Sequence, residues 1–137
     1  MTYLVDANVL SEVTKLMPAA RVVAWLRHHE PELVVDPIVI GEIRFGIHLL
    51  PAGQRRLHLE RWFAEGVQRL HCLPWDAVTG LRWAQLLADL RKRGKTMPVK
   101  DSMIAATALC HGLKIATRNV TDFSPAGVAL VDPFLAP

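Results

Sequence analysis

The sequence lacks the features of a membrane-spanning, secreted or disulfide-stabilised protein. It has no run of about 18 uncharged apolar residues, so we expect no membrane-spanning helix. The amino terminus has no basic segment, and Asp6 interrupts its apolar stretch, so we expect no signal peptide. The only cysteines are Cys72 and Cys110, and no Cys-x-x-Cys pair is present. We therefore expect two buried thiols in a protein of the reducing cytoplasm.

Several common catalytic signatures are also absent. No Walker A or Gly-x-Gly-x-x-Gly loop is available to bind phosphate, and no Gly-x-Ser-x-Gly elbow marks a serine hydrolase. The six histidines show no recognised metal-ligand spacing. Hydrophobic residues make up 51% and charged residues 21% of the chain, a balance that excludes a disordered protein. The 137 residues suit a single domain, which we expect to span 1–137.

Short apolar runs alternate with helical patterns along the whole chain. The pattern predicts strands at 3–5, 33–35, 70–73, 113–117 and 128–131. It predicts helices from residue 8 to the break at Pro18 and at 19–29, 38–50, 54–68, 77–93 and 98–111, with a loop or one helical turn at 121–126. This alternation predicts an α/β/α sandwich with a mainly parallel central sheet of four to five strands.

Two of these helices carry apolar residues at helical spacing. In the first helix, Val9, Leu10 and Val13 are expected to share one face. In the helix at 77–93, helical spacing places the following residues on one face: Leu81, Ala84, Leu87, Ala88 and Arg91.

Acidic residues stand near the carboxyl ends of the predicted strands, where ligands bind in open α/β sheets. The candidates are Asp6 after the first strand, Glu42 in the helix after the second, Asp101 in the first turn of the helix before the fourth, and Asp122 after the fourth. Each acid alone has an ordinary explanation as a helix cap, a dipole partner, an ion-pair partner or a turn residue.

Asp101 is the least expected of these acids. It lies on the apolar stripe of its own helix, with Ile104, Ala105, Ala108 and Leu109 at helical spacing. A carboxylate there is costly unless it is paired or metal-bound. Several acids at one sheet edge also repel each other without a cation. Such a cluster of oxygen ligands predicts a Mg²⁺ or Mn²⁺ site rather than a zinc site.

The charge distribution favours a nucleic-acid substrate. The chain has 16 Lys and Arg against 13 Asp and Glu, and without the four candidate acids 13 − 4 = 9 acids remain, a balance of +7. An acidic pit in a basic body is expected of a metal-dependent nuclease, since basic side chains hold phosphates. The candidate phosphate contacts are Arg91, Lys92, Arg93, Lys95, Lys100 and Arg118. A solvated loop is the alternative interpretation of the run at 91–95.

Four segments, in order, resemble the motifs of the PIN-domain nucleases, in particular the VapC/FitB-like toxins of type II toxin–antitoxin systems. They are Tyr3–Glu12, Gly41–Gly46, Asp101–Ala108 and Thr117–Phe123. The resemblance implies that Asp6, Glu42 and Asp101 bind metal. Some relatives have Asp where this sequence has Asn119, so either Asn119 or Asp122 completes the site. Asn8 and Thr117 resemble residues that orient the acids.

The same resemblance implies a PIN-like fold and a cytoplasmic endoribonuclease that hydrolyses structured or single-stranded RNA. Acid-held Mg²⁺, replaceable by Mn²⁺, would activate a water molecule. A homodimer and a cognate antitoxin are implied, with operator DNA bound only through the antitoxin. The alternatives are an inactive PIN-like RNA-binding module and a haloacid-dehalogenase-like phosphatase. The phosphatase fits less well, because Asn8 stands where it normally has a second Asp.

Overall fold

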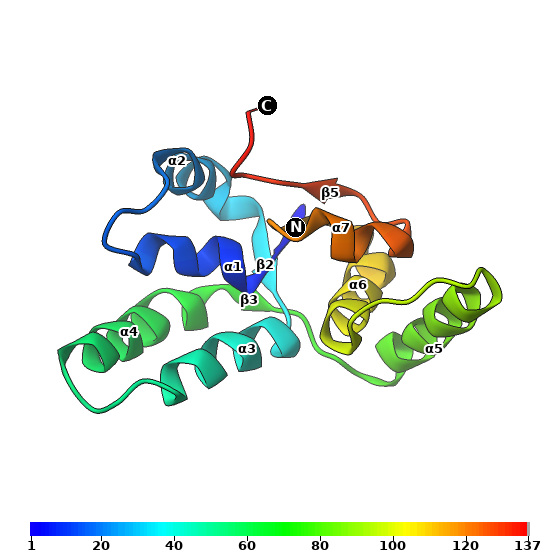
Figure 1. Cartoon of the computed structure of the whole chain (residues 1–137), viewed down its shortest axis with the longest axis horizontal. Coiled ribbons are helices and arrows are strands. Elements are labelled where there is room, and N and C mark those ends of the chain that lie inside the picture. Colours follow the sequence, from blue (N-terminus) through cyan, green and yellow to red (C-terminus); the bar gives the residue numbers. More distant parts are fainter. Residues whose placement is uncertain (137) are drawn as a thin grey trace.

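The strand Tyr3–Val5 forms the middle of a parallel β-sheet (Figure 1). The structure, a computed structural model, describes residues 1–136, and Pro137, where the predicted domain ends, lies outside them. The strands are β1 Tyr3–Val5, β2 Leu33–Val35, β3 His71–Cys72, β4 Lys114–Ala116 and β5 Leu130–Val131. The helices are α1 Ala7–Leu10, α2 Ala20–His29, α3 Pro37–His48, α4 Gln54–Glu65, α5 Ala77–Lys92, α6 Val99–His111 and α7 Val120–Phe123. Short 3₁₀ turns lie at Ser11–Thr14, Glu30–Glu32, Val67–Arg69 and Ser124–Ala126.

The strand order within residues 1–136 is β3-β2-β1-β4-β5, and every neighbouring pair is parallel. Leu4 of β1 is in register with Val34 on one side and Ile115 on the other. All carboxyl ends therefore meet at one edge of the sheet, with β1 at its centre. In Figure 1, α1 and α4 lie on one side of the strands, and α5 and α6 lie on the other. This confirms the predicted sandwich.

The buried core is built from strand residues and from one face of α3 and of α6. Members of this core are Leu4, Val5, Val35, Ile115, Val39, Ile43, Ile47, Ile104 and Ala108. The helix boundaries follow local sequence signals. Asp36 caps α3 and Pro37 is its first residue, while Gly112 ends α6 in a left-handed conformation with φ of 64°. No helix among the described residues is long and apolar enough to cross a membrane.

Several predictions of detail were wrong. The first helix ends at Leu10 and continues as a 3₁₀ turn, and Val13 is 37% exposed instead of sharing the buried face. In α5 the buried residues are Thr79, Leu86 and Leu90, whereas Leu81 is 74% exposed. The helix has a second apolar stripe, and only one of the two can pack on α6.

The third strand and the cysteines also differ from expectation. β3 has two residues, both exposed, because it lies at the sheet edge, where it pairs with β2 alone. Cys72 is consequently exposed and Cys110 half-buried, and both are free thiols. The prediction of two buried thiols was therefore wrong.

Candidate active site

Asp6 occupies the position directly after the central strand and is 3% exposed. It caps α1, and its Oδ1 accepts a 2.8 Å hydrogen bond from the Ala7 amide. Its Oδ2 accepts hydrogen bonds from Thr117 Oγ1 at 2.7 Å and Asn8 Nδ2 at 3.2 Å. Burial raises the pKa of Asp6 above its usual value, and these donors partly oppose the rise. The structure thus holds a carboxylate at the sheet edge in one fixed orientation.

Asn8 and Thr117 connect Asp6 to the loop after β4. The side-chain oxygen of Asn8 accepts a 3.2 Å hydrogen bond from the Arg118 amide. Thr117 Oγ1 accepts one of 3.0 Å from the Asn119 amide while it donates to Asp6. The two residues therefore link the ends of β1 and β4, which is the supporting position that the motifs predict for them.

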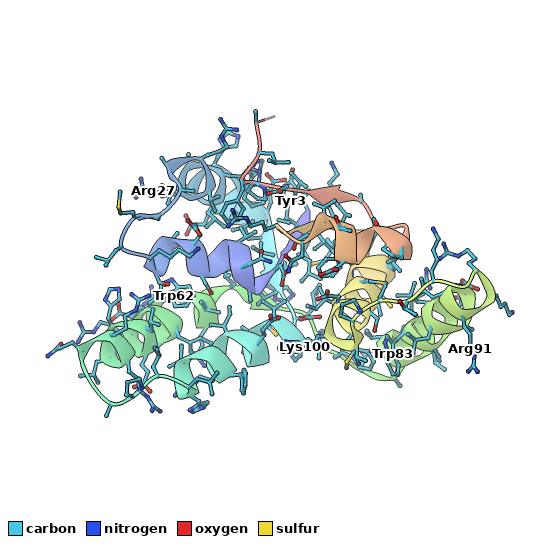
Figure 2. The ribbon with its side chains drawn as sticks, viewed as in Figure 1. Tyr3, Arg27, Trp62, Trp83, Arg91 and Lys100 are labelled. Atoms are coloured by element: carbon cyan, nitrogen blue, oxygen red, sulfur yellow. The ribbon has the colours of Figure 1, made fainter. Side chains whose placement is uncertain are left out.

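Glu42 approaches the same edge from α3. Glu42 lies six residues after the amino-terminal cap Asp36, and its side chain keeps 33% exposure. Its Oε1 lies 3.6 Å from Nζ of Lys100, which directly precedes Asp101. Figure 2 shows Lys100 at the start of α6, near the amino-terminal end of α3. This ion pair places the Glu42 side chain of α3 near the start of α6, which carries Asp101.

Asp101, in the first turn of α6, is the most perturbed acid of the site. Burial raises its pKa to about 6, with further contributions from the negative charges of Asp6, Asp122 and Glu42. The charge of Lys100 opposes this rise. Carboxylates from three other elements thus lie close enough to Asp101 for their charges to affect it.

Asp122 and Asn119 are the two candidates for the fourth position. Both are exposed, Asn119 as the residue before α7 and Asp122 within it. Asp122 acts on Asp101 through its charge. Asn119 makes no side-chain cap to α7. Both residues therefore stay candidates for the fourth ligand, Asp122 as a charged one and Asn119 as a neutral one.

The candidate acids lie at one edge of the sheet, but their carboxylates do not surround a common point. Among residues 1–136, no group of three or more His, Cys, Asp or Glu side chains is arranged to hold a metal ion. The donor set nevertheless consists of carboxylates, the ligands that suit Mg²⁺ and Mn²⁺. Glu42 is partly exposed, and its Oε1 contacts Lys100 at 3.6 Å. The fit to a hard divalent cation therefore lies in the chemistry of the donor set and not in its arrangement.

The predicted phosphate contacts fall into two groups. Lys100 lies at the acids, and the Arg118 amide contacts Asn8, while the Arg118 guanidinium lies 4.3 Å from the centre of the Phe134 ring. Figure 2 places Arg91 at the far end of α5, well away from Lys100. The remaining candidates, Lys92, Arg93 and Lys95, belong to that end of α5 and the turn after it. Within this second group, Arg93 donates a 3.0 Å hydrogen bond to the Pro125 carbonyl in the turn after α7. No ion pair joins the group to the candidate acids among residues 1–136.

Asp36 is a buried acid that the motif analysis did not select. It follows β2 as Asp6 follows β1 and is 0% exposed. Burial raises its pKa, and the charge of Asp6 adds to the rise. The signal was present in the sequence, since an Asp follows each of two apolar strands, but Asp36-Pro37 was interpreted as a strand end.

Comparison with known proteins identifies the family. The profile of the PIN domain matches residues 3–124, a range that contains all four motifs. VapC ribonuclease Y4jK of Sinorhizobium fredii is 36% identical, covering 94% of this chain and 95% of the relative. Toxin FitB of Neisseria gonorrhoeae is 35% identical, covering 96% of this chain and 97% of the relative.

Solved structures agree with this assignment. FitAB bound to an IR36 DNA fragment has a TM-score of 0.92 at 31% identity, covering 99% of this chain and 98% of that chain. FitAcB from Neisseria gonorrhoeae has a TM-score of 0.90 at 33% identity, covering 97% and 99%. The family match, the ordered motifs and the shared fold confirm the resemblance seen in the sequence, and this chain belongs to the PIN-domain family.

Proposed function

We propose that this protein is a metal-dependent endoribonuclease and the toxin of a type II toxin–antitoxin pair. The observation that carries the proposal is the position of Asp6, Glu42, Asp101 and Asp122 at one edge of the sheet. Burial raises the pKa of Asp101 to about 6, and the negative charges of the other three acids add to the rise. Mutual repulsion of this kind disfavours a purely structural role, because folding gains nothing from gathering like charges. Relatives named as a ribonuclease and a toxin support the same activity.

Asp6, Glu42 and Asp101 would hold Mg²⁺, or Mn²⁺ in its place, with Asp122 or Asn119 as the fourth ligand. When bound, such an ion supplies positive charge that activates water and stabilises the charge developing on the phosphodiester. Asn8 and Thr117 orient the Asp6 carboxylate through their hydrogen bonds.

The basic residues account for binding of structured or single-stranded RNA. Lys100 stands beside the acids, where its ammonium group can leave Glu42 and bind a phosphate next to the scissile bond. Arg118 provides a second cation: its amide contacts Asn8, while its guanidinium lies over the Phe134 ring. The group at the end of α5, which comprises Arg91, Lys92, Arg93 and Lys95, would bind the RNA backbone farther along the strand.

Exposed apolar side chains are consistent with binding of other proteins to this surface. Leu16 and Met17, in the segment before α2, are 100% and 90% exposed, which suits contact with a cognate antitoxin. Phe45 of α3 and Leu81 of α5 are 61% and 74% exposed, which suits a homodimer. Operator DNA would be reached only through the antitoxin, and the similar FitAB structure was solved with a DNA fragment. We place this activity in the cytoplasm, where its RNA substrates are.

Cleavage of a panel of small structured RNAs tests the proposal. The purified protein is assayed with Mg²⁺, with Mn²⁺ and with EDTA, beside Asp101→Asn and the matched control Asp89→Asn. Asp89 is an exposed acid on α5, outside the site. We expect metal-dependent cleavage that Asp101→Asn abolishes and Asp89→Asn retains. Equal cleavage by the wild type and Asp101→Asn would contradict the proposal, and absence of both cleavage and Mn²⁺ binding would favour an inactive RNA-binding module.

A further inference from the structure

Asp36 and Thr107 form a buried hydrogen-bonded pair between α3 and α6. Both residues are 0% exposed. Asp36 Oδ1 accepts a 2.9 Å hydrogen bond from the Val39 amide and so caps α3. Its Oδ2 accepts a 2.8 Å hydrogen bond from Thr107 Oγ1 on α6. One carboxylate therefore binds two helices that lie far apart in the sequence.

These two helices carry acids of the candidate active site. Glu42 lies six residues after Asp36 on α3, and Asp101 lies six residues before Thr107 on α6. At a rise of 1.5 Å per residue, each acid is about 9 Å along its helix from the shared hydrogen bond. A change in the spacing of the helices at this pair is thus transmitted to the spacing of Glu42 and Asp101.

Capping of α3 alone does not explain this arrangement. A cap uses one side-chain oxygen, and Asn or Ser would provide it without a buried charge. The cap of α5 shows the simpler form, in which Asp76 Oδ1 accepts from both the amide and the hydroxyl of Thr79 within the same helix. Asp76 is exposed, whereas Asp36 is buried and directs its second oxygen to another helix.

The carboxylate of Asp36 also interacts electrostatically with an acid of the candidate active site. The nearby Asp6 carboxylate contributes to raising the pKa of Asp36. Asp36 therefore lies close enough to Asp6 for the two carboxylates to repel each other.

We infer that Asp36 and Thr107 are positioning residues, whose hydrogen bond fixes the separation of α3 and α6 and thereby prepares Glu42 and Asp101 to bind a divalent cation. This inference rests on the proposed function. The pair touches neither substrate nor metal, and its effect passes through the two helices. Residues that orient metal ligands in this way typically change metal affinity by about 10- to 100-fold when removed.

Calorimetric titration with Mn²⁺ tests the pair, with thermal unfolding in EDTA measured alongside. Thr107→Val removes the hydroxyl at nearly constant volume, and Thr107→Ser restores it. Thr79→Val is the matched control, because Thr79 is 1% exposed and also hydrogen bonds to a capping Asp. We expect Thr107→Val to weaken Mn²⁺ binding about tenfold. Thr79→Val and Thr107→Ser should remain within about twofold of the wild type.

Unchanged Mn²⁺ affinity in Thr107→Val, or equal weakening in Thr79→Val, would overturn the inference. Asp36→Asn provides a second variant, since its amide keeps the acceptor for Val39 and donates to the Thr107 hydroxyl. It should therefore retain the helix spacing and unfold cooperatively.

A crystal structure of Thr107→Val separates this inference from the proposed function. If the wild type neither binds Mn²⁺ nor cleaves RNA, the proposed function fails, but the helix spacing can still be measured. An increase in the Cα separation of Glu42 and Asp101 relative to the wild type would support the pair, and an unchanged separation would refute it.

Discussion

Thr117 Oγ1 donates a 2.7 Å hydrogen bond to Asp6 Oδ2, although 111 residues separate them in the chain. The bond joins the carboxyl ends of β1 and β4, which are neighbours in the sheet. Both side chains are buried, so the hydrogen bond is shielded from bulk solvent.

Thr117→Val should therefore destabilise the protein when Asp6 is ionised. We expect a loss of about 1–3 kcal/mol in the free energy of unfolding at pH 8, because a buried acceptor loses its donor. The pKa of Asp6 rises further in the variant, so the loss should be smaller at pH 5. Urea unfolding at both pH values measures the effect, and Thr121→Val, at an exposed position, is the control. An equal loss at both pH values would argue against a role for the Asp6 charge.

Asp101→Asn should stabilise the metal-free protein at neutral pH. The pKa of Asp101 is about 6 in the folded state, above its usual value of 3.8. Its contribution to stability is therefore fully present below pH 3.8 and is lost as the pH rises through 6. After allowance for partial exposure, we expect Asp101→Asn to be more stable by about 1 kcal/mol at pH 7.5 and equal near pH 4.

Urea unfolding in EDTA at the two pH values checks this prediction. Added Mn²⁺ should then reverse the order, since the wild type alone retains the full set of acids. A variant that is less stable than the wild type at pH 7.5 in EDTA would contradict the repulsion inferred at the site.

Lys100→Met should change metal binding and RNA binding in opposite directions. Lys100 lowers the pKa of Asp101 by its positive charge, and a cation at that place competes with a metal ion. Because the Lys100 side chain is 61% exposed, its coupling is weak, and we expect Mn²⁺ to bind about two- to threefold more tightly in the variant. The KM for RNA should rise, since a phosphate contact is lost.

Calorimetry with Mn²⁺ and steady-state cleavage of one RNA substrate separate the two effects. Lys114→Met, at an exposed position at the amino end of β4, is the control for loss of a positive charge. Weaker Mn²⁺ binding in Lys100→Met would show that the lysine supports the metal site instead of competing for it.

Variants at Asp122 and Asn119 should identify the fourth ligand. Asp122 raises the pKa of Asp101 through its charge, so Asp122→Asn should lower that pKa toward the usual value. We expect Asp122→Asn to weaken Mn²⁺ binding about fivefold or more, and Asn119→Ala to change it by less than about twofold. NMR titration of the Asp101 carboxyl carbon and calorimetry measure the two effects. The reverse order of Mn²⁺ affinities would assign the fourth position to Asn119.

The sequence was sufficient to place the acids because their positions depend on strand order and helix phase. Asp6 and Thr117 each end an apolar run, and parallel strands deliver both to the same edge. Asp101 was conspicuous because it interrupts an apolar stripe. These patterns are local in the sequence, and the parallel sheet brings the residues that carry them to one edge. For this reason both the sandwich and the convergence of acids were predictable.

The features that the sequence did not predict depend on which element packs against a given helix or strand. Both apolar stripes of α5 are consistent with a helix, and only packing on α6 decides that Leu86 is buried and Leu81 exposed. The position of β3 at the sheet edge exposes Cys72. Thr107 shows no special pattern in the sequence, because its partner Asp36 lies 71 residues away.

The central position of β1 in the sheet also affects when the candidate site can form during synthesis of the chain. β1 is made first, but its neighbour β4 spans Lys114–Ala116, and Asp6 obtains its hydroxyl donor only from Thr117. The hydrogen bond that orients the Asp6 carboxylate can therefore form only after Thr117 has been translated. A chain that stops before Thr117 would contain Asp6, Glu42 and Asp101 but would lack the hydroxyl that orients Asp6.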